Sequence, residues 1–256
     1  MLICKNCGHL VDQKFCPSCG QRVSIDRIRF SSILGDISYA VLNLDRGFFY
    51  NLVALFRRPG YAIKEYLDGK RRKYYHPLSY LLVVLAAMLI AMNFLEVHYY
   101  DPVQDASMSS ERTEFWKEYD QTQQMWIRYY KYFIPFYLPW MGLIYYGWLR
   151  LLKAKYNYWE CLVISFFVSA QMTIPQIIIL VLVSLFGSTA FARTSDMIIN
   201  NAILIVLYYL QFYQLGSDAL RPGRRAALSI LGAAAMLAFV YAAIFGFLGF
   251  AKWIGL

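Results

Sequence analysis

Residues 161–186, CLVISFFVSAQMTIPQIIILVLVSLF, contain no charged side chain. A helix needs roughly 20 predominantly apolar residues to cross the hydrocarbon core of a bilayer, so this stretch predicts a membrane-spanning helix. The whole chain agrees, because 59% of its 256 residues are hydrophobic, 16% are charged and the mean hydropathy is +0.40. A soluble domain carries about 25% charged residues. The composition therefore excludes an ordinary water-soluble globule.

Apolar stretches of similar length lie on both sides of this one. They predict further spans at 78–97, 132–152, 197–215 and 226–250. We therefore expect an all-α membrane protein with about five transmembrane helices, in which residues 78–256 form the transmembrane domain. The first two spans are separated by an acidic loop, 98–124, which we expect to be external and to contain a helix from about residue 110.

Two Cys-x-x-Cys pairs, each followed by glycine, lie close together near the N-terminus and contain Cys4, Cys7, Cys16 and Cys19. Two such pairs bring four thiolates to one centre, which suits the tetrahedral preference of Zn²⁺. Iron could bind the same thiolates, whereas a disulfide or a redox motif fits two neighbouring pairs less well. We therefore predict that residues 1–24 form a small Cys4 zinc ribbon with a closed, structural site.

The charges are distributed unevenly along the chain. Residues 1–77 contain 13 basic and 6 acidic side chains, whereas residues 98–124 contain six acidic and two basic ones. Lys and Arg are retained on the cytoplasmic side of a membrane, and zinc–thiolate sites favour a reducing compartment. Both arguments place the N-terminus in the cytoplasm, and five crossings then place the C-terminus outside.

Residues 25–77 are expected to form amphipathic helices at the cytoplasmic lipid interface. Apolar side chains recur at helical spacing at Phe30, Ile33, Leu34, Ile37, Val41 and Leu44, and shorter apolar runs follow at 47–56 and 61–67. A basic cluster follows these runs and comprises Arg57, Arg58, Lys70, Arg71, Arg72 and Lys73. It predicts contact with the bilayer, either as recognition of anionic headgroups or, more simply, as an anchor for the first span. Nucleic acid is not an expected partner, because the basic residues lie beside membrane spans.

Several polar residues lie within the predicted spans, and Glu160 lies at the cytoplasmic end of the third. The candidates for an intramembrane polar site are Glu160, Gln171, Asn200 and Gln211. Ionisable groups in a membrane are costly and are functional suspects, but uncharged polar groups are also satisfied by hydrogen bonds between helices, and we favour that structural interpretation. In the fifth span the small residues Ala234, Ala238, Ala242 and Gly246 repeat every four positions, which predicts a surface for close helix packing.

Short motifs connect the cysteine pairs to the first span. They are Phe15-Cys16-Pro17-Ser18-Cys19-Gly20-Gln21, Asp45-Arg46-Gly47-Phe48, Arg58-Pro59-Gly60, Tyr66-Leu67-Asp68-Gly69-Lys70-Arg71 and Pro77. With these motifs the chain resembles a family of uncharacterised bacterial membrane proteins, catalogued as a domain of unknown function, that combine a zinc ribbon with several spans. The resemblance implies this architecture and a bacterial inner membrane, and it implies no activity.

No phosphate-binding glycine loop, nucleophile elbow or His-Glu-x-x-His pattern is present, so no catalytic residue is assigned and an enzyme is not favoured. The favoured hypothesis is a non-catalytic partner-binding or assembly component of an envelope complex, which contacts its partner through the ribbon or the fifth span. The alternative is a transporter or channel for a small solute or lipid that uses the polar residues of spans three and four.

Overall fold

The computed structural model describes residues 2–24, 27–29, 46–95 and 97–253. Two short strands, β1 (Leu2–Ile3) and β2 (Leu10–Val11), pair antiparallel near the N-terminus. The chain continues with α3 (Arg46–Arg57), α4 (Pro59–Leu67), α5 (Pro77–Phe94), α6 (Ser110–Leu151), α7 (Tyr158–Phe186), α8 (Thr189–Thr194), the π-helical turn η1 (Ser195–Asn200), α9 (Asn201–Leu215) and α10 (Pro222–Trp253). The amphipathic helix predicted from Phe30 to Leu44 lies outside the described residues, and the predicted domain boundaries stay predictions.

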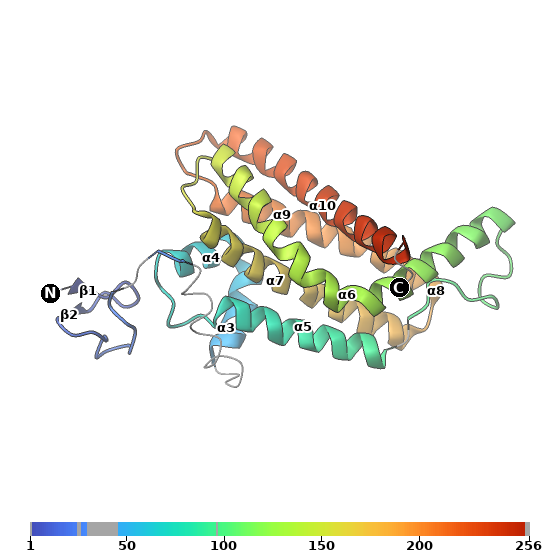
Figure 1. Ribbon diagram of the computed structural model, residues 1–256, viewed down its shortest axis with the longest axis horizontal. Helices are drawn as coiled ribbons and strands as arrows, with labels where there is room; N and C mark the ends of the chain where they lie inside the picture. The colour runs from blue at the N-terminus through green and yellow to red at the C-terminus, as the bar shows by residue number, and fades with distance from the viewer. Residues whose placement is uncertain (1, 25–26, 30–45, 96, 254–256) are drawn as a thin grey trace.

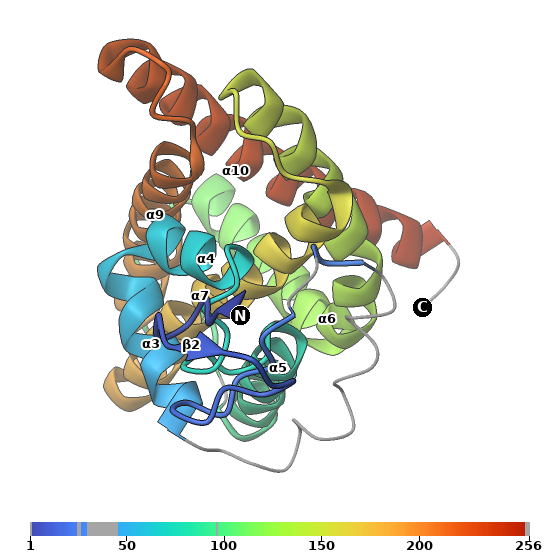
Figure 2. The ribbon, with the colours of Figure 1, turned by 90° about the vertical axis from the view of Figure 1, so that its left-hand side faces the viewer.

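The long helices run alternately up and down one elongated bundle, with the strands at one end (Figure 1). We call the end near the strands the ribbon end and the opposite end the distal end. The connections 152–157 and 216–221 lie at the ribbon end, and the connection 97–109 lies at the distal end. Seen from the ribbon end, α7 lies in the middle of the other helices (Figure 2). It is also the most buried span, with 56% of its most apolar window buried, against 22% for α10.

Four helices in the described part of the chain are long and apolar enough to cross a membrane. They are Pro77–Phe94, Tyr158–Phe186, Thr189–Leu215 and Pro222–Phe250. These four correspond to the spans predicted at 78–97, 161–186, 197–215 and 226–250. The protein is therefore mostly helical and membrane-embedded, as predicted, but four helices rather than the predicted five are apolar enough to count as spans, and the orientation of the two termini stays a prediction.

The missing span, predicted at 132–152, is the second half of α6. This helix is continuous with the helix predicted in the acidic loop, and it begins at residue 110 as expected. Residues 132–149 carry no charge but include four tyrosines, two tryptophans and two prolines, which makes them less apolar than the other spans. The segment nevertheless packs within the bundle, because Met141, Tyr145 and Leu149 are at most 1% exposed.

The short helix α4 packs on the bundle at the ribbon end, where backbones approach closely. A Cβ atom at Gly60 would lie 2.5 Å from Cβ of Gln214 in α9. The Oε1 atom of Gln214 accepts hydrogen bonds from the backbone N–H groups of Gly60 (2.8 Å) and Tyr61 (3.1 Å). Ala62 and Ile63 are fully buried. The helix predicted to lie at the lipid interface is therefore also packed against α9.

The substitution Gly60→Ala is expected to destabilise the protein by about 1–3 kcal/mol, because the added methyl group overpacks the contact between α4 and α9. Gly147→Ala, in α6, is the matched control, because a Cβ at Gly147 meets no atom within 4 Å. We expect that control to be neutral or stabilising by up to about 1 kcal/mol. Thermal unfolding of the purified variants in detergent measures the difference, and equal midpoints would contradict the close approach.

Candidate metal centre and polar sites

The four N-terminal cysteines come together in one cluster. Their Sγ atoms all lie within 4.8 Å of one another. The Sγ atoms of Cys4 and Cys19 are 3.6 Å apart, and those of Cys7 and Cys16 are 3.5 Å apart. Tetrahedral coordination with Zn–S bonds of about 2.3 Å requires S–S distances of about 3.8 Å. The cluster therefore fits a tetrahedral metal ion.

Two matching turns build this cluster. The N–H of Gly8 donates to the carbonyl of Cys4, and the N–H of Gly20 donates to the carbonyl of Cys16, both at 2.8 Å. Both glycines have positive φ, +77° and +72°, which side chains with a Cβ rarely adopt. The glycine after each Cys-x-x-Cys pair is thus explained, and we call the two turns the first and the second knuckle.

The second knuckle faces the bundle through Gln21. The Nε2 atom of Gln21 donates to the carbonyl of Gly69 (2.9 Å), and its Oε1 atom accepts from the N–H groups of Arg71 (3.1 Å) and Arg72 (3.0 Å). The Nε atom of Arg72 donates to the carbonyl of Cys19 (3.2 Å). Gln21 is buried, whereas His9, at the same position of the first knuckle, is exposed. The first knuckle therefore points away from the bundle. Sequence analysis quoted Gln21 as the end of a motif but assigned it no contact.

The basic cluster is largely occupied by contacts within the chain. Arg58 and Lys73 form ion pairs with Glu65 at 2.7 and 2.6 Å. Arg71 lies over the ring of Tyr66, and Arg72 contacts the second knuckle. Arg57 and Lys70 are exposed. Recognition of anionic headgroups stays a prediction, and four of its six residues already have partners.

Glu65 makes stability depend on pH. Burial alone would raise its pKa, but hydrogen bonds from Lys73, Arg58 and Tyr74 outweigh burial and lower the pKa to about 2. Because the folded pKa lies below the ordinary value of 4.5, the carboxylate stabilises the fold above about pH 4.5, and this contribution is lost as the pH falls towards 2.

The substitution Glu65→Gln is therefore expected to lower stability by about 1–3 kcal/mol near neutral pH. The difference from the unsubstituted protein should shrink as the pH falls below about 4.5. Thermal unfolding of both proteins across this range checks the prediction, and a difference that does not change with pH would contradict it.

Glu160 lies at the ribbon end, where it begins α7. Its carboxylate accepts from Arg27, with Nη2–Oε2 at 2.7 Å and Nε–Oε1 at 3.0 Å, and it is almost fully buried. It also forms a capping box with Asn157, in which each side chain accepts the other's backbone N–H at 2.8 Å. Lys155, which is near it in sequence, contributes only a backbone carbonyl, to Arg27.

Gln171 and Gln211 form a separate chain of hydrogen bonds in the middle of the bundle. Gln211 Nε2 donates to Gln171 Oε1 at 2.9 Å, and the hydroxyl of Tyr145 donates to Gln211 Oε1 at 2.9 Å. Gln171 Nε2 donates to the carbonyl of Leu55. Both glutamines are 0% exposed. This closed network joins α3, α6, α7 and α9, which supports a structural role for the two glutamines.

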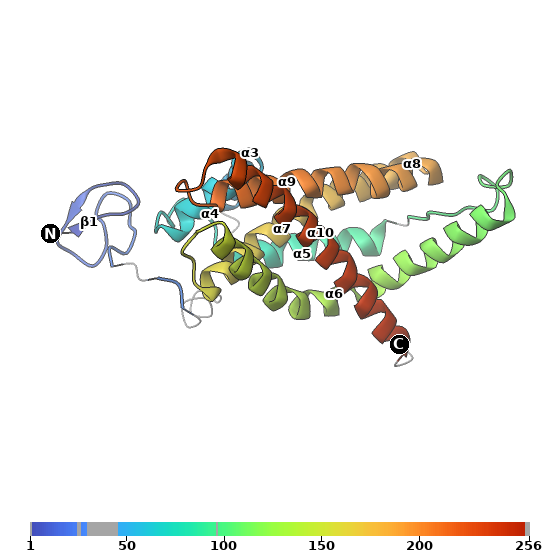
Figure 3. The ribbon, with the colours of Figure 1, turned by 90° about the horizontal axis from the view of Figure 1, so that it is seen from above.

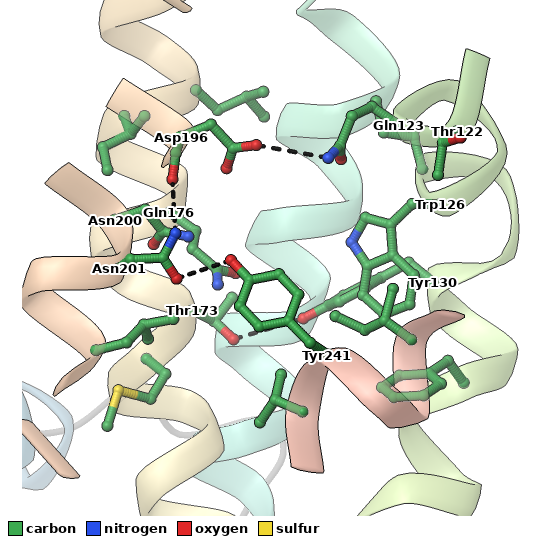
Figure 4. A pocket seen from close by; sticks show the side chains of 18 of the residues that line it. Thr122, Gln123, Trp126, Tyr130, Thr173, Gln176, Asp196, Asn200, Asn201 and Tyr241 are labelled. Carbon is green, nitrogen blue, oxygen red and sulfur yellow. Dashed lines mark hydrogen bonds between the residues drawn. The ribbon is translucent and has the colours of Figure 1, made fainter. Parts of the chain in front are cut away.

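Asn200 is separate from both of these groups and lines a cavity of about 900 Å³ in the distal half of the bundle. Its Oδ1 atom is buried without a hydrogen-bond partner. Asp196, Asn201 and Gln123 line the same cavity (Figure 4). The structure thus brings Gln171 and Gln211 together but separates Asn200 and Glu160 from them. Sequence analysis missed Asp196, which could have been noticed as the sole acidic residue of the span 189–215.

The small residues of α10 lie on its outer face. Ala234, Ala238, Ala242 and Gly246 are all exposed. α10 packs instead through Gly232, where a Cβ would lie 2.4 Å from Trp148 Nε1. The Nε1–H of Trp148 donates to the carbonyl of Leu228 at 2.9 Å. The predicted surface therefore makes no close packing within the described chain.

The fold and the cysteine cluster define a polytopic helical membrane protein with an N-terminal ribbon whose four cysteines could hold a metal ion. A family model described as "Protein of unknown function (DUF3667)" matches residues 45–89, which include α3, α4, the basic cluster and most of α5. The matched part includes the motifs from Asp45 to Pro77 and does not reach the cysteine pairs. Searches of curated proteins and of solved structures find no match.

Proposed function

We propose that this protein is a non-catalytic, partner-binding component of a complex in a bacterial inner membrane, and that its cytoplasmic zinc ribbon is the docking module. The observation that carries the proposal is the apolar surface of the first knuckle and its hairpin. Its side chains are Leu2, Ile3 and Leu10, which are 60%, 65% and 62% exposed, and Phe15, next to the second knuckle, is 54% exposed. Exposed apolar patches of this kind mark interaction sites.

The position of this surface favours a protein partner over lipid. The ribbon projects beyond α4 along the long axis of the bundle (Figures 1 and 3). Lipid surrounds the sides of a helical bundle, so side chains beyond its end lie in the aqueous phase. An apolar surface there gains free energy by packing against another protein.

The ribbon is suited to docking because it is held in place. Zn²⁺, bound by the four cysteines, would supply the free energy that folds a segment too small for a core of its own. Gln21 and Arg72 then hold the second knuckle against the bundle. A preorganised surface loses less conformational freedom on binding than a flexible one.

The transport alternative has narrower support. Glu160 is neutralised by Arg27, and Gln171 and Gln211 bond to each other, so none of the three provides an open polar path. One observation favours it, namely the distal cavity lined by Asn200. The exposed small-residue surface of α10 stays a predicted contact for another membrane chain.

A photoreactive amino acid at Leu10 tests the docking proposal in native membranes. Leu10 lies opposite Ile3 in the hairpin. We expect one crosslinked partner at Leu10, and we expect Ile3→Asp to abolish it. Gln13, exposed in the loop between the two knuckles, is the matched control position. The proposal is wrong if Leu10 forms no adduct, or if its adduct also forms at Gln13 and survives Ile3→Asp.

A further inference from the structure

The distal cavity is polar near its distal end and apolar towards the middle of the bundle. Thr122 and Gln123 of α6 face Asp196 of η1 and the start of α9 near the distal end (Figure 4). The deeper lining is mostly apolar and includes Phe133, Ile134, Met172, Leu204, Leu237 and Val240, with the hydroxyl-bearing residues Tyr137, Ser169 and Tyr208 among them. Both α6 and α9 run from the distal end towards the ribbon end, so Phe133 lies about 15 Å deeper than Gln123. The volume of about 900 Å³ is near the upper end of ligand pockets, which span about 300–1,000 Å³.

The charge of the lining is one-sided. Among the described residues the lining contains two carboxylates, Glu118 and Asp196, and no Lys, Arg or His. The carboxylate of Asp196 accepts from two neutral groups, the hydroxyl of Tyr119 and Nε2 of Gln123. Arg193, one turn earlier, does not line the cavity and is bound by Asp105. The negative charge of Asp196 is therefore not balanced by a cation in the described chain.

Aromatic rings and a π-helical turn lie next to the carboxylate of Asp196. Trp126, Tyr130 and Tyr241 line the cavity beside the polar groups. Aromatic faces attract cations, most strongly where water is excluded. Asp196 and Asn200 belong to η1, a single π-helical turn, and such turns are frequent at functional sites. The unpartnered Oδ1 atom of Asn200 offers a further acceptor.

We propose that the cavity binds a cationic amphiphile, a molecule with a protonated amine or quaternary ammonium head and a hydrocarbon tail. The head lies at Asp196 among the aromatic rings, and the tail lies between α6 and α10 towards the middle of the bundle. An anionic head is disfavoured, because it would face Asp196 and Glu118 without a cation to balance it. The site shares no residue with the ribbon, so it is independent of the docking proposal.

A hexadecylamine that carries a photoreactive group in its tail tests this site on the full-length protein in nanodiscs. We expect covalent labelling of peptides from residues 126–137 and 237–248. Hexadecyltrimethylammonium and unlabelled hexadecylamine should compete with the label, whereas palmitate and hexadecanol, which have the same tail length, should not. The ammonium and amine competitors together distinguish which cationic head binds better.

The head is tested with Asp196→Asn, which should weaken hexadecylamine binding by about tenfold or more, a change of about 1.4 kcal/mol. Glu114→Gln is the matched control, because Glu114 is an exposed acid of α6 outside the lining, and it should leave binding unchanged. Val240→Trp, which fills the deeper part of the cavity, should abolish labelling. This second variant tests the site independently of whether Asp196→Asn folds. Equal competition by palmitate, labelling elsewhere in the chain, or unchanged binding by folded Asp196→Asn would overturn the proposal.

Discussion

Replacing Cys16 by Ser is expected to release the metal and to unfold the ribbon while the helical bundle stays intact. Cys16 is 2% exposed, and its Sγ atom lies 3.5 Å from that of Cys7, so the substitution removes one of the four clustered thiolates. Structural Zn²⁺ contributes about 10–16 kcal/mol to folding in small zinc-finger peptides. The contacts of Gln21 with the bundle should be lost together with the second knuckle.

Metal analysis of the purified protein measures the first consequence, and limited proteolysis within residues 2–24 measures the second. Cys161→Ala is the matched control, since Cys161 is fully buried in the bundle and is not part of the cluster. One metal ion per chain is expected in the control and none in Cys16→Ser. The same analysis distinguishes zinc from iron. Full metal content in Cys16→Ser would exclude the four-cysteine site.

Arg193→Met is expected to destabilise the distal end by about 3–5 kcal/mol, because it breaks a buried ion pair and leaves one charge unpaired. The side chains of Arg193 and Asp105 are 9% and 4% exposed. Arg193 also donates to the carbonyl of Tyr99 at 2.7 Å and lies 4.4 Å from the ring centre of Trp116. Burial alone would raise the pKa of Asp105, but the hydrogen bond from Arg193 keeps it below its ordinary value.

Removing the charge of the partner should recover part of this loss. We expect Arg193→Met combined with Asp105→Asn to be more stable than Arg193→Met alone, because the double variant buries no unpaired carboxylate. Arg112→Met, at an exposed position of α6, should change stability by less than about 0.5 kcal/mol. Thermal unfolding of the four proteins provides the comparison. A double variant no more stable than Arg193→Met would show that the unpaired charge is not the cause.

Features that depend on neighbouring residues were predictable from the sequence. The spacing of the cysteines and the glycines after them predicts the cluster, because a knuckle is closed by hydrogen bonds within six residues. Four spans follow from composition alone. The second span was miscounted because its aromatic residues pack within the bundle but are less apolar than aliphatic ones, as Tyr145 and Trp148 show.

Contacts between distant parts of the chain could not be predicted in this way. Gln21 is 48 residues from Gly69, and Arg27 is 133 residues from Glu160. Hydrophobic periodicity identifies which face of a helix is buried, but it does not identify the residues that pack against that face. The candidate polar residues were therefore treated as one candidate site, whereas the contacts that separate them depend on which helices adjoin. Asp196 was missed because the predicted fourth span begins one residue later, and the fold is needed to bring Tyr119 and Gln123 to it.

Glu160 links the segment next to the ribbon to the start of the central helix α7. One carboxylate oxygen, Oε2, accepts both from Arg27, near the ribbon, and from the backbone of Asn157, which caps α7. Any partner that binds the ribbon more tightly when Arg27 is engaged must strengthen the contact between Arg27 and Glu160 by the same free energy, since such coupling is reciprocal. The distal half of α7 lines the cavity. Coupling between the ribbon surface and the distal cavity can therefore be measured directly. The measurement is the change in binding affinity at one of these sites when the other is filled.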